Sequence, residues 1–142
     1  MDSISSRAAR LLLAAACALT AFLGVPAASA SAPPVPAAVA APPCGDVSSY
    51  QQVDLSQLPR EATDTVNLIK KGGPYPYRQD GQVWDNREGT LPDCGSTYYH
   101  EYTVKTPGSP DRGARRFVVG GHGEYFYTGD HYESFALTHV DR

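Results

Sequence analysis

The second half of the chain alternates short runs of aromatic and β-branched residues with turns rich in glycine and proline. These runs cover residues 98–105, 115–119, 125–128 and 133–137. Aromatic and β-branched side chains favour the half-buried surface of a sheet, and Gly/Pro turns separate successive strands. The pattern therefore predicts a run of antiparallel strands. Shorter strands are indicated at residues 50–55, on a sheet edge, and at residues 82–84.

One helix is predicted ahead of these strands. Pro59 suits a first helical turn, while Lys70 and Lys71 lie at the negative end of the helix dipole. The apolar residues that share one helix face are Ala62, Val66 and Ile69. Residues 72–74, Gly-Gly-Pro, end the helix. A single N-terminal helix that covers one face of an antiparallel sheet predicts an α+β fold.

Residues 1–30 have the pattern of a secretory signal peptide. Arg7 and Arg10 precede an apolar run that ends in a small-residue cleavage site. Residues 31–43 are rich in alanine, proline and valine and carry no charge, which is typical of a linker. Residues 44–142 are long enough for one small domain. We therefore expect a secreted, extracellular protein with no membrane attachment after signal cleavage.

The net charge of the chain limits the kinds of partner that it can bind. From residue 31 onward there are ten basic and fourteen acidic residues, a net charge of −4. Tight, non-specific binding to long nucleic acid needs a broad basic surface, so the charge argues against that class of protein. A short anionic substrate held by a local cluster of basic residues is still compatible with this net charge. Arg112, Arg115 and Arg116 form such a cluster.

Cys44 and Cys94 are the two cysteines left after signal removal, because Cys17 lies in the apolar run of the signal. In an exported protein we expect these two to form a disulfide. The alternatives are two free thiols or a metal site. A metal site needs more ligands than two cysteines, and no spacing in the sequence supplies them. The sequence therefore predicts no metal and no cofactor.

Residues 98–104 place polar chemistry on a predicted strand. Alternation puts Glu101 on one face, together with Tyr99 and Thr103. A carboxylate on a sheet, with arginines arriving at residues 112–116, is easiest to justify if an anion such as a phosphate binds between them. A histidine and a tyrosine then follow a tight turn within residues 128–132. We expect the three segments to meet at one site.

The chain resembles a known family at six motifs. They are L-P-x-E-A-T-D-T at residues 58–65, G-P-Y-P-Y at 73–77, N-R-E at 86–88, Y-Y-H-E-Y-T-V at 98–104, R-G-A-R-R at 112–116 and Y-T-G-D-H-Y at 127–132. In this order they closely resemble the small secreted guanyl-specific ribonucleases of Streptomyces. That family belongs to the microbial ribonuclease superfamily, with barnase and the fungal guanyl ribonucleases. The resemblance implies their fold for nearly all of residues 44–142.

The resemblance also implies roles for particular residues. Glu101 would be the general base, His131 the general acid, and Arg112 and Arg116 the phosphate ligands. The implied guanine-binding residues are Trp84, Asn86, Arg87, Glu88 and Tyr132. Trp84-Asp85 departs from the relatives, which have aliphatic or phenylalanine and glutamine residues in this loop.

Each candidate also has a plain structural interpretation. A strand glutamate is usually solvated, arginine pairs on a surface contribute little stability, and N-R-E is an ordinary charged turn. Trp84 and Tyr132 would serve equally well as core aromatics. Arg115 is expected on the opposite strand face from Arg116.

Three further histidines compete with His131, which we expect at the start of a strand. We expect His100 to point away from Glu101, His122 to lie in an exposed loop and His139 near a frayed terminus.

RNA carries a nucleophile that DNA lacks, the 2′-hydroxyl beside each phosphate. Its cleavage needs a base, an acid and cations that stabilise the developing charge. We therefore expect a monomeric, metal-independent endoribonuclease that cuts single-stranded RNA after guanosine through a 2′,3′-cyclic phosphate. The alternatives are a non-catalytic module that binds a guanine nucleotide or a protein, and a toxin paired with a barstar-like inhibitor.

Overall fold

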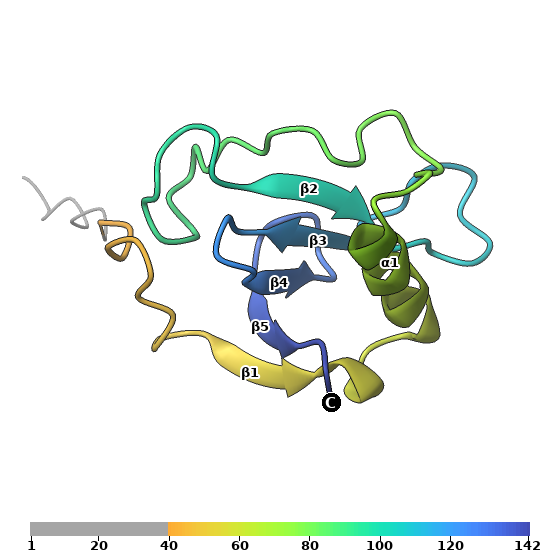
Figure 1. Cartoon of the computed structure of the whole chain (residues 1–142), viewed down its shortest axis with the longest axis horizontal. Coiled ribbons are helices and arrows are strands. Elements are labelled where there is room, and N and C mark those ends of the chain that lie inside the picture. The colour runs from red at the N-terminus through yellow and green to blue at the C-terminus, as the bar shows by residue number, and fades with distance from the viewer. Residues whose placement is uncertain (1–39) are drawn as a thin grey trace, which may run out of the picture. The chain divides into compact units, whose positions relative to one another are not determined.

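The computed structural model describes residues 40–142, which belong to one compact unit. The predicted signal peptide and all but the last four residues of the predicted linker lie outside the described residues. The elements in chain order are β1 (Gln51–Asp54), the 3-10 helix η1 (Leu55–Gln57), α1 (Arg60–Lys71), β2 (His100–Thr103), β3 (Arg116–Val119), β4 (Tyr125–Thr128) and β5 (Ala136–His139). One helix and one five-stranded sheet make an α+β fold (Figure 1), so the predicted fold class is confirmed.

The sheet has the strand order β1-β5-β4-β3-β2. Strands β2 to β5 pair antiparallel, as the sequence predicts. Strand β1 forms the predicted edge but runs parallel to β5, with Gln51 opposite Ala136, which the sequence did not indicate. Strand β5 also begins three residues later than predicted, because residues 130–134 form a hydrogen-bonded loop.

The segment predicted as a strand at residues 82–84 covers the free edge of β2. It forms only an isolated bridge between Val83 and His100. The Trp84 N–H donates to the Tyr99 carbonyl at 2.9 Å, and the Glu101 N–H donates to the Gln82 carbonyl at 3.0 Å. These backbone bonds hold the start of the N-R-E loop beside the strand that carries Glu101.

Helix α1 lies beside the carboxyl end of β2 (Figure 1). Its buried stripe packs Ala62 and Val66 against Phe117 of β3 and against Val104, which directly follows β2. The helix ends at Gly72, whose left-handed backbone (φ 75°) lets its N–H donate to the Ile69 carbonyl at 3.0 Å. Glycine takes this conformation without steric cost, which explains the helix end.

A second cluster fills the opposite face of the sheet. Its buried members are Leu91, Tyr99, Val118 and Phe126. Cross-strand neighbours share a face, so the pairing of Glu101 with Val118 and of Thr103 with Arg116 places these polar side chains on this second face too. The candidate site residues of the sheet thus lie on the face away from the helix.

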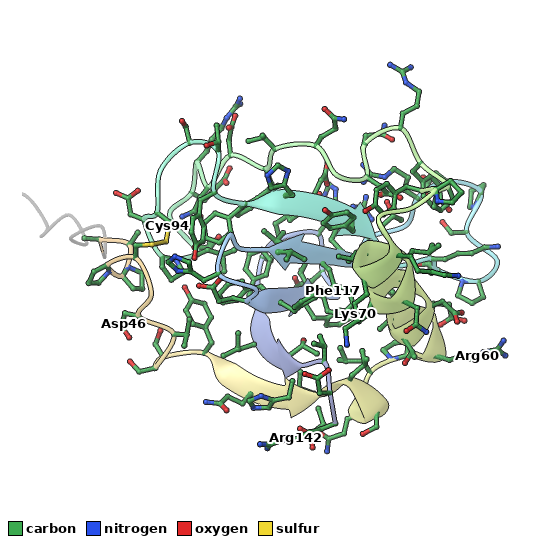
Figure 2. The ribbon with its side chains drawn as sticks, in the orientation of Figure 1. Asp46, Arg60, Lys70, Cys94, Phe117 and Arg142 are labelled. Atoms are coloured by element: carbon green, nitrogen blue, oxygen red, sulfur yellow. A yellow bond between two sulfur atoms is a disulfide. The ribbon has the colours of Figure 1, made fainter. Side chains whose placement is uncertain are left out.

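Cys44 and Cys94 form the predicted disulfide, with a Cα–Cα distance of 4.6 Å across 50 residues of chain. Figure 2 shows this bond at the end of the sheet remote from α1. The alternatives of free thiols and of a metal site at these cysteines are therefore wrong. Among residues 40–142, no three His, Cys, Asp or Glu side chains gather to hold a metal ion, and no helix has the length and apolar character needed to cross a membrane.

Candidate active site

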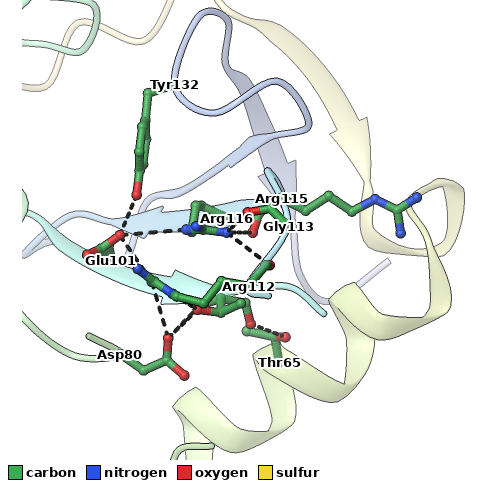
Figure 3. Close-up of polar contacts among 9 residues, drawn as sticks. Thr65, Asp80, Glu101, Arg112, Gly113, Arg115, Arg116 and Tyr132 are labelled. Carbon is green, nitrogen blue, oxygen red and sulfur yellow. Dashed lines mark hydrogen bonds and ion pairs between the residues drawn. The ribbon is translucent and has the colours of Figure 1, made fainter. Parts of the chain in front are cut away.

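Glu101 lies at the centre of a polar cluster on the second face of the sheet (Figure 3). Its Oε2 lies 3.4 Å from an Nη2 of Arg112 and 3.8 Å from Nε of Arg116, and it accepts a hydrogen bond from the Tyr132 hydroxyl. The carboxylate side chain is 15% exposed. Two guanidinium groups and a phenol thus surround one partly buried carboxylate.

Arg116 is the most deeply buried cation of this cluster, with 3% of its surface exposed. Its Nη1 donates to the backbone carbonyls of Gly113 and Arg115 at 2.9 and 2.7 Å. Among the described residues its Nε has no hydrogen-bond partner, because Glu101 is too distant at 3.8 Å. A buried donor without a partner costs free energy, and an anion bound beside Glu101 would satisfy it.

Arg112 is held from both sides. Its Nη2 contacts Glu101, and its Nε donates to Thr103 Oγ1 at 2.9 Å. Its guanidinium also lies 3.8 Å from Asp80 and over the ring of Tyr77 at 6.0 Å. Planar guanidinium groups fixed in this way present their remaining N–H donors in a defined direction.

Asp80 is a site residue that the sequence did not reveal. Its side chain is 2% exposed, and its Oδ1 accepts hydrogen bonds from the backbone N–H and the hydroxyl of Thr103 at 2.7 and 2.6 Å. Thr103 in turn accepts from Arg112, so the carboxylate orients the arginine through the threonine. Asp80-Gly81 has the sequence of an exposed turn, and no signal in it reports burial.

Arg115 does not belong to the cluster. It points away from Glu101 (Figure 3), and its Nη1 lies 3.8 Å from Glu61 on helix α1. This agrees with its expected position on the opposite strand face from Arg116.

His131 and Tyr132 lie in the loop between β4 and β5, not at the start of a strand as predicted. Both have left-handed backbones, with φ of 60° and 75°, and in the described part of the chain they are the non-glycine residues with positive φ. Such conformations cost on the order of 1–3 kcal/mol each and cluster at functional sites. The His131 N–H donates to the Ala114 carbonyl at 3.2 Å, which ties this loop to the arginine segment.

The other histidines lie elsewhere. His100 Nδ1 is 3.0 Å from the Gly81 carbonyl oxygen, and His122 has a 78% exposed side chain at the β3–β4 turn. His139 lies within β5, where Nε2 is 2.8 Å from Gln52 Oε1, so its expected position at a frayed end is wrong. Of the four histidines, His131 is the one that borders the arginine cluster.

Tyr132 links the two halves of the site. Its hydroxyl donates to Glu101, and its ring packs 5.5 Å from Trp84. Burial of the phenol, and then its hydrogen bond to the Glu101 carboxylate, raise the pKa of Tyr132 to about 12. The phenol therefore keeps its proton at neutral pH and stays a hydrogen-bond donor.

A cavity of about 600 Å³ lies beside the cluster. It is lined by Val83, Trp84, Asp85, Arg87, Glu88, Thr90, His131, Tyr132 and Glu133. Four of the five implied guanine-binding residues therefore line one pocket. Asn86 does not: its side-chain amide donates to the Leu91 carbonyl at 2.6 Å and accepts from the Leu91 N–H at 3.0 Å, which closes the loop.

A second cavity of about 480 Å³ covers the arginine side. Its lining is Asp111, Arg112, Gly113, Ala114, Arg116 and His131. His131 borders both cavities, so an exposed imidazole stands where an anion pocket meets an aromatic, acidic pocket. This arrangement is suited to acid–base chemistry on a phosphate attached to a planar base.

The fold and the site define an α+β protein with an arginine-lined cavity beside an aromatic, acidic pocket. A family model described as ribonuclease matches residues 41–139, and the chain belongs to the ribonuclease family. The predicted resemblance to guanyl-specific ribonucleases is thereby confirmed.

Curated relatives are similar over almost all of the described residues. The chain is 71% identical over 99 residues to guanyl-specific ribonuclease St of Saccharopolyspora erythraea, a match that covers 70% of this chain and 98% of the relative. It is 58% identical over 86 residues to guanyl-specific ribonuclease Sa of Kitasatospora aureofaciens, covering 60% of this chain and 90% of that one.

Solved structures agree with these matches. The structure of ribonuclease Sa2 complexes with mononucleotides has a TM-score of 0.64 at 50% identity, covering 66% of this chain and 98% of that one. The crystal structure of ribonuclease Sa2 with guanosine-2′-cyclophosphate has a TM-score of 0.62 at 50% identity, covering 65% and 99%.

Proposed function

We propose that this protein is a guanyl-specific endoribonuclease that cuts single-stranded RNA on the 3′ side of guanosine. The observation that carries the proposal is the position of His131 and Glu101 around the two arginines: Glu101 contacts both guanidinium groups, and His131 borders the same anion cavity. The names of the curated relatives support the guanyl specificity.

Glu101 acts as the general base of the first step. It takes the proton of the guanosine 2′-hydroxyl, whose oxygen attacks the adjacent phosphorus. His131 acts as the general acid and gives its proton to the departing 5′-oxygen of the next nucleotide. The products are a 2′,3′-cyclic phosphate and a free 5′-hydroxyl. Positioned acids and bases each contribute about 10²–10⁴-fold to such reactions.

Arg112 and Arg116 stabilise the charge that develops on the phosphate oxygens. The unpartnered Nε of Arg116 supports this role, since a donor fixed in advance needs no reorganisation during the reaction. In a second, slower step the roles reverse: His131 takes a proton from water, Glu101 returns one to the 2′-oxygen, and a 3′-phosphate results. Metal-independence stays a prediction, which retention of activity in EDTA would support and loss of activity would contradict.

Guanine recognition is assigned to the pocket that Glu88 borders. Guanine presents N1–H and its 2-amino group on one edge, and one carboxylate accepts from both. Adenine has a lone pair at N1, which the carboxylate would repel. Among the described residues Glu88 makes no ion pair, so its carboxylate is free for this contact. Trp84 and Tyr132 supply aromatic surface for the base, with Asn86 and Arg87 shaping the loop.

A digest of mixed-sequence RNA, followed by sequencing of the product ends, tests the proposal. The wild type is expected to leave guanosine at the 3′ ends. Glu88→Ala should lose that bias, whereas Glu101→Ala should keep it at a rate lower by about 10²–10⁴-fold. Cleavage of GpC without a cyclic intermediate would contradict the mechanism. Absence of any cleavage would favour a non-catalytic binding module.

The domain boundaries and the localisation are part of the same proposal. We assign residues 1–30 to a signal peptide, residues 31–43 to a linker and residues 44–142 to the enzyme domain, which acts as a secreted monomer. The disulfide between Cys44 and Cys94 supports an oxidising compartment. N-terminal sequencing of protein recovered from culture medium tests the cleavage site. Co-purification with a barstar-like protein would add an inhibitor to the system.

A further inference from the structure

The His131-Tyr132 pair needs a support that keeps it in place. Both residues have left-handed backbones, and both lie in a loop, whereas Glu101 and Arg116 are fixed by strands β2 and β3. A left-handed backbone at a residue with a side chain is unfavourable, so surrounding contacts must impose it. The contacts that do so come from residues to which the proposed mechanism gives no task.

Thr128 is the first of these residues. It ends strand β4 and is 1% exposed, on the sheet face that also carries Arg116. Its Oγ1 accepts the Tyr132 N–H at 3.0 Å and the Asp130 N–H at 3.4 Å, and donates to Asp130 Oδ1 at 2.8 Å. One buried hydroxyl thus fixes the backbone on both sides of His131.

Asp130 is the second. Its Oδ1 accepts the Ser134 N–H at 3.0 Å, and its Oδ2 accepts the Ser134 hydroxyl. These hydrogen bonds from Ser134, with that from Thr128, lower the pKa of Asp130 to about 2, so the carboxylate is charged at any working pH. The bonds close the loop around the two site residues, while the His131 N–H reaches across to Ala114.

We propose that Thr128 and Asp130 are positioning residues for the reaction, which together with Ser134 hold His131 at the anion cavity and the Tyr132 hydroxyl on Glu101. We call these three residues the loop clamp. This inference rests on the proposed function. It differs from a purely structural turn because one bond ends on the backbone N–H of Tyr132 and the other on that of Asp130, directly before His131. A displacement of the imidazole by about 1 Å would cost up to about 100-fold in rate.

The sharpest test compares two substitutions of one side chain in the full-length mature enzyme. Thr128→Val removes the hydroxyl at nearly constant shape, whereas Thr128→Ser keeps it. With GpC as substrate, we expect Thr128→Val to lower kcat by about 10- to 100-fold with KM within about threefold, because the Glu88 side of the base pocket is unchanged. Thr128→Ser should stay within about threefold of the wild-type kcat.

Thr138→Val is the matched control. Thr138 is a buried threonine of β5 whose hydroxyl has no partner among the described residues, so its loss should leave kcat unchanged. Rates are corrected for the folded fraction, measured by circular dichroism. Should Thr128→Val fail to fold, Asp130→Asn, at an exposed position, takes its place with an expected fall in kcat of at least about fivefold.

Three outcomes separate the possibilities. A wild type that does not cleave GpC overturns the proposed function itself. An active wild type with folded Thr128→Val or Asp130→Asn variants at full kcat overturns the loop clamp alone. An equal loss of activity in Thr128→Val and Thr138→Val also overturns it, since a general packing defect would then explain both.

Discussion

Among residues 40–142, Tyr132 carries the one hydroxyl that contacts Glu101, and its removal isolates that contact. Tyr132→Phe keeps the ring that packs on Trp84 and removes the donor. A hydrogen bond to a charged group contributes about 1.5–3 kcal/mol, so we expect kcat/KM for GpC to fall by about 10- to 100-fold with the guanine preference retained. Steady-state kinetics measure this. Tyr125→Phe, on the helix face of the sheet, is the control, and an unchanged rate in Tyr132→Phe would contradict the role.

Asp80 is more deeply buried than Glu101, with side chains that are 2% and 15% exposed. Asp80→Ala leaves the Thr103 N–H without an acceptor and removes a carboxylate from beside Arg112. Breaking a buried charged network costs about 3–5 kcal/mol, and urea unfolding should show a loss of that size in the free energy of unfolding. Asp64→Ala, at an exposed helix position, should change stability by no more than about 0.5 kcal/mol. Equal effects of the two substitutions would show that Asp80 has no special role.

At the scale of elements, the sequence predicted what depends on local chemistry. Helix α1 follows from its apolar stripe and its glycine end, and β3 and β4 from their aromatic and β-branched runs. The parallel pairing of β1 with β5 joins strands about 85 residues apart, and periodicity holds no information about direction at that distance. The late start of β5 reflects the hydrogen bonds that Ser134 donates to the Asp130 carboxylate, which override the strand preference of the segment.

At the scale of elements, the disulfide also constrains the N-R-E loop, which we call the base loop. Cys94 follows the residues that Asn86 holds, and the Asp93 N–H donates to the Pro42 carbonyl at 2.8 Å, so the bond anchors the segment after the loop to the N-terminal segment. Replacing both cysteines with serine opens a loop of 50 residues, which should lower the free energy of unfolding by roughly 4 kcal/mol on the chain-entropy account.

Loss of the disulfide should lower the stability of the domain without slowing the chemical step. Because Glu101, Arg116 and His131 are held by other contacts, kcat for GpC should stay within about threefold at temperatures where the variant is folded, while KM rises if the base loop loosens. Urea unfolding and GpC kinetics on one preparation provide both readouts. A loss of kcat with stability unchanged would contradict this division.

At the scale of the whole domain, the motifs predicted the proposed catalytic residues but not the residues that support them. Glu101, Arg112, Arg116 and His131 were proposed from the resemblance to the ribonucleases, and the sheet register brings Glu101 and Arg116 to one face. Asp80 and the loop clamp were not recognisable, since their roles depend on burial and on hydrogen bonds between turns. Asn86, one of the implied guanine-binding residues, closes the loop through hydrogen bonds of its side chain with Leu91. The type of a residue predicts its chemistry more readily than it predicts whether the residue holds others in place.

Tyrosine burial predicts how the whole domain responds to alkali. Seven tyrosines have a pKa raised above the ordinary value, in each case mainly by burial: Tyr50, Tyr98, Tyr99, Tyr102, Tyr125, Tyr127 and Tyr132. Above a pH of about 10 the unfolded chain loses tyrosine protons that the folded domain retains, so the unfolded state binds fewer protons and the free energy of unfolding falls as pH rises. For Tyr102 and Tyr132 this fall continues to a pH of about 12.

The urea midpoint should therefore decrease between about pH 9 and about pH 11, and the ultraviolet absorbance of tyrosinate should rise together with the loss of secondary structure. Tyr102→Phe, at the half-buried tyrosine of β2 that contacts Tyr75, should make the decrease shallower, because one proton-binding group is removed from the linkage. Exposed tyrosines would instead ionise near pH 10 in the native domain without unfolding it. Native-state ionisation of all nine tyrosines at that pH would show that the aromatic clusters on the two faces of the sheet are open to water.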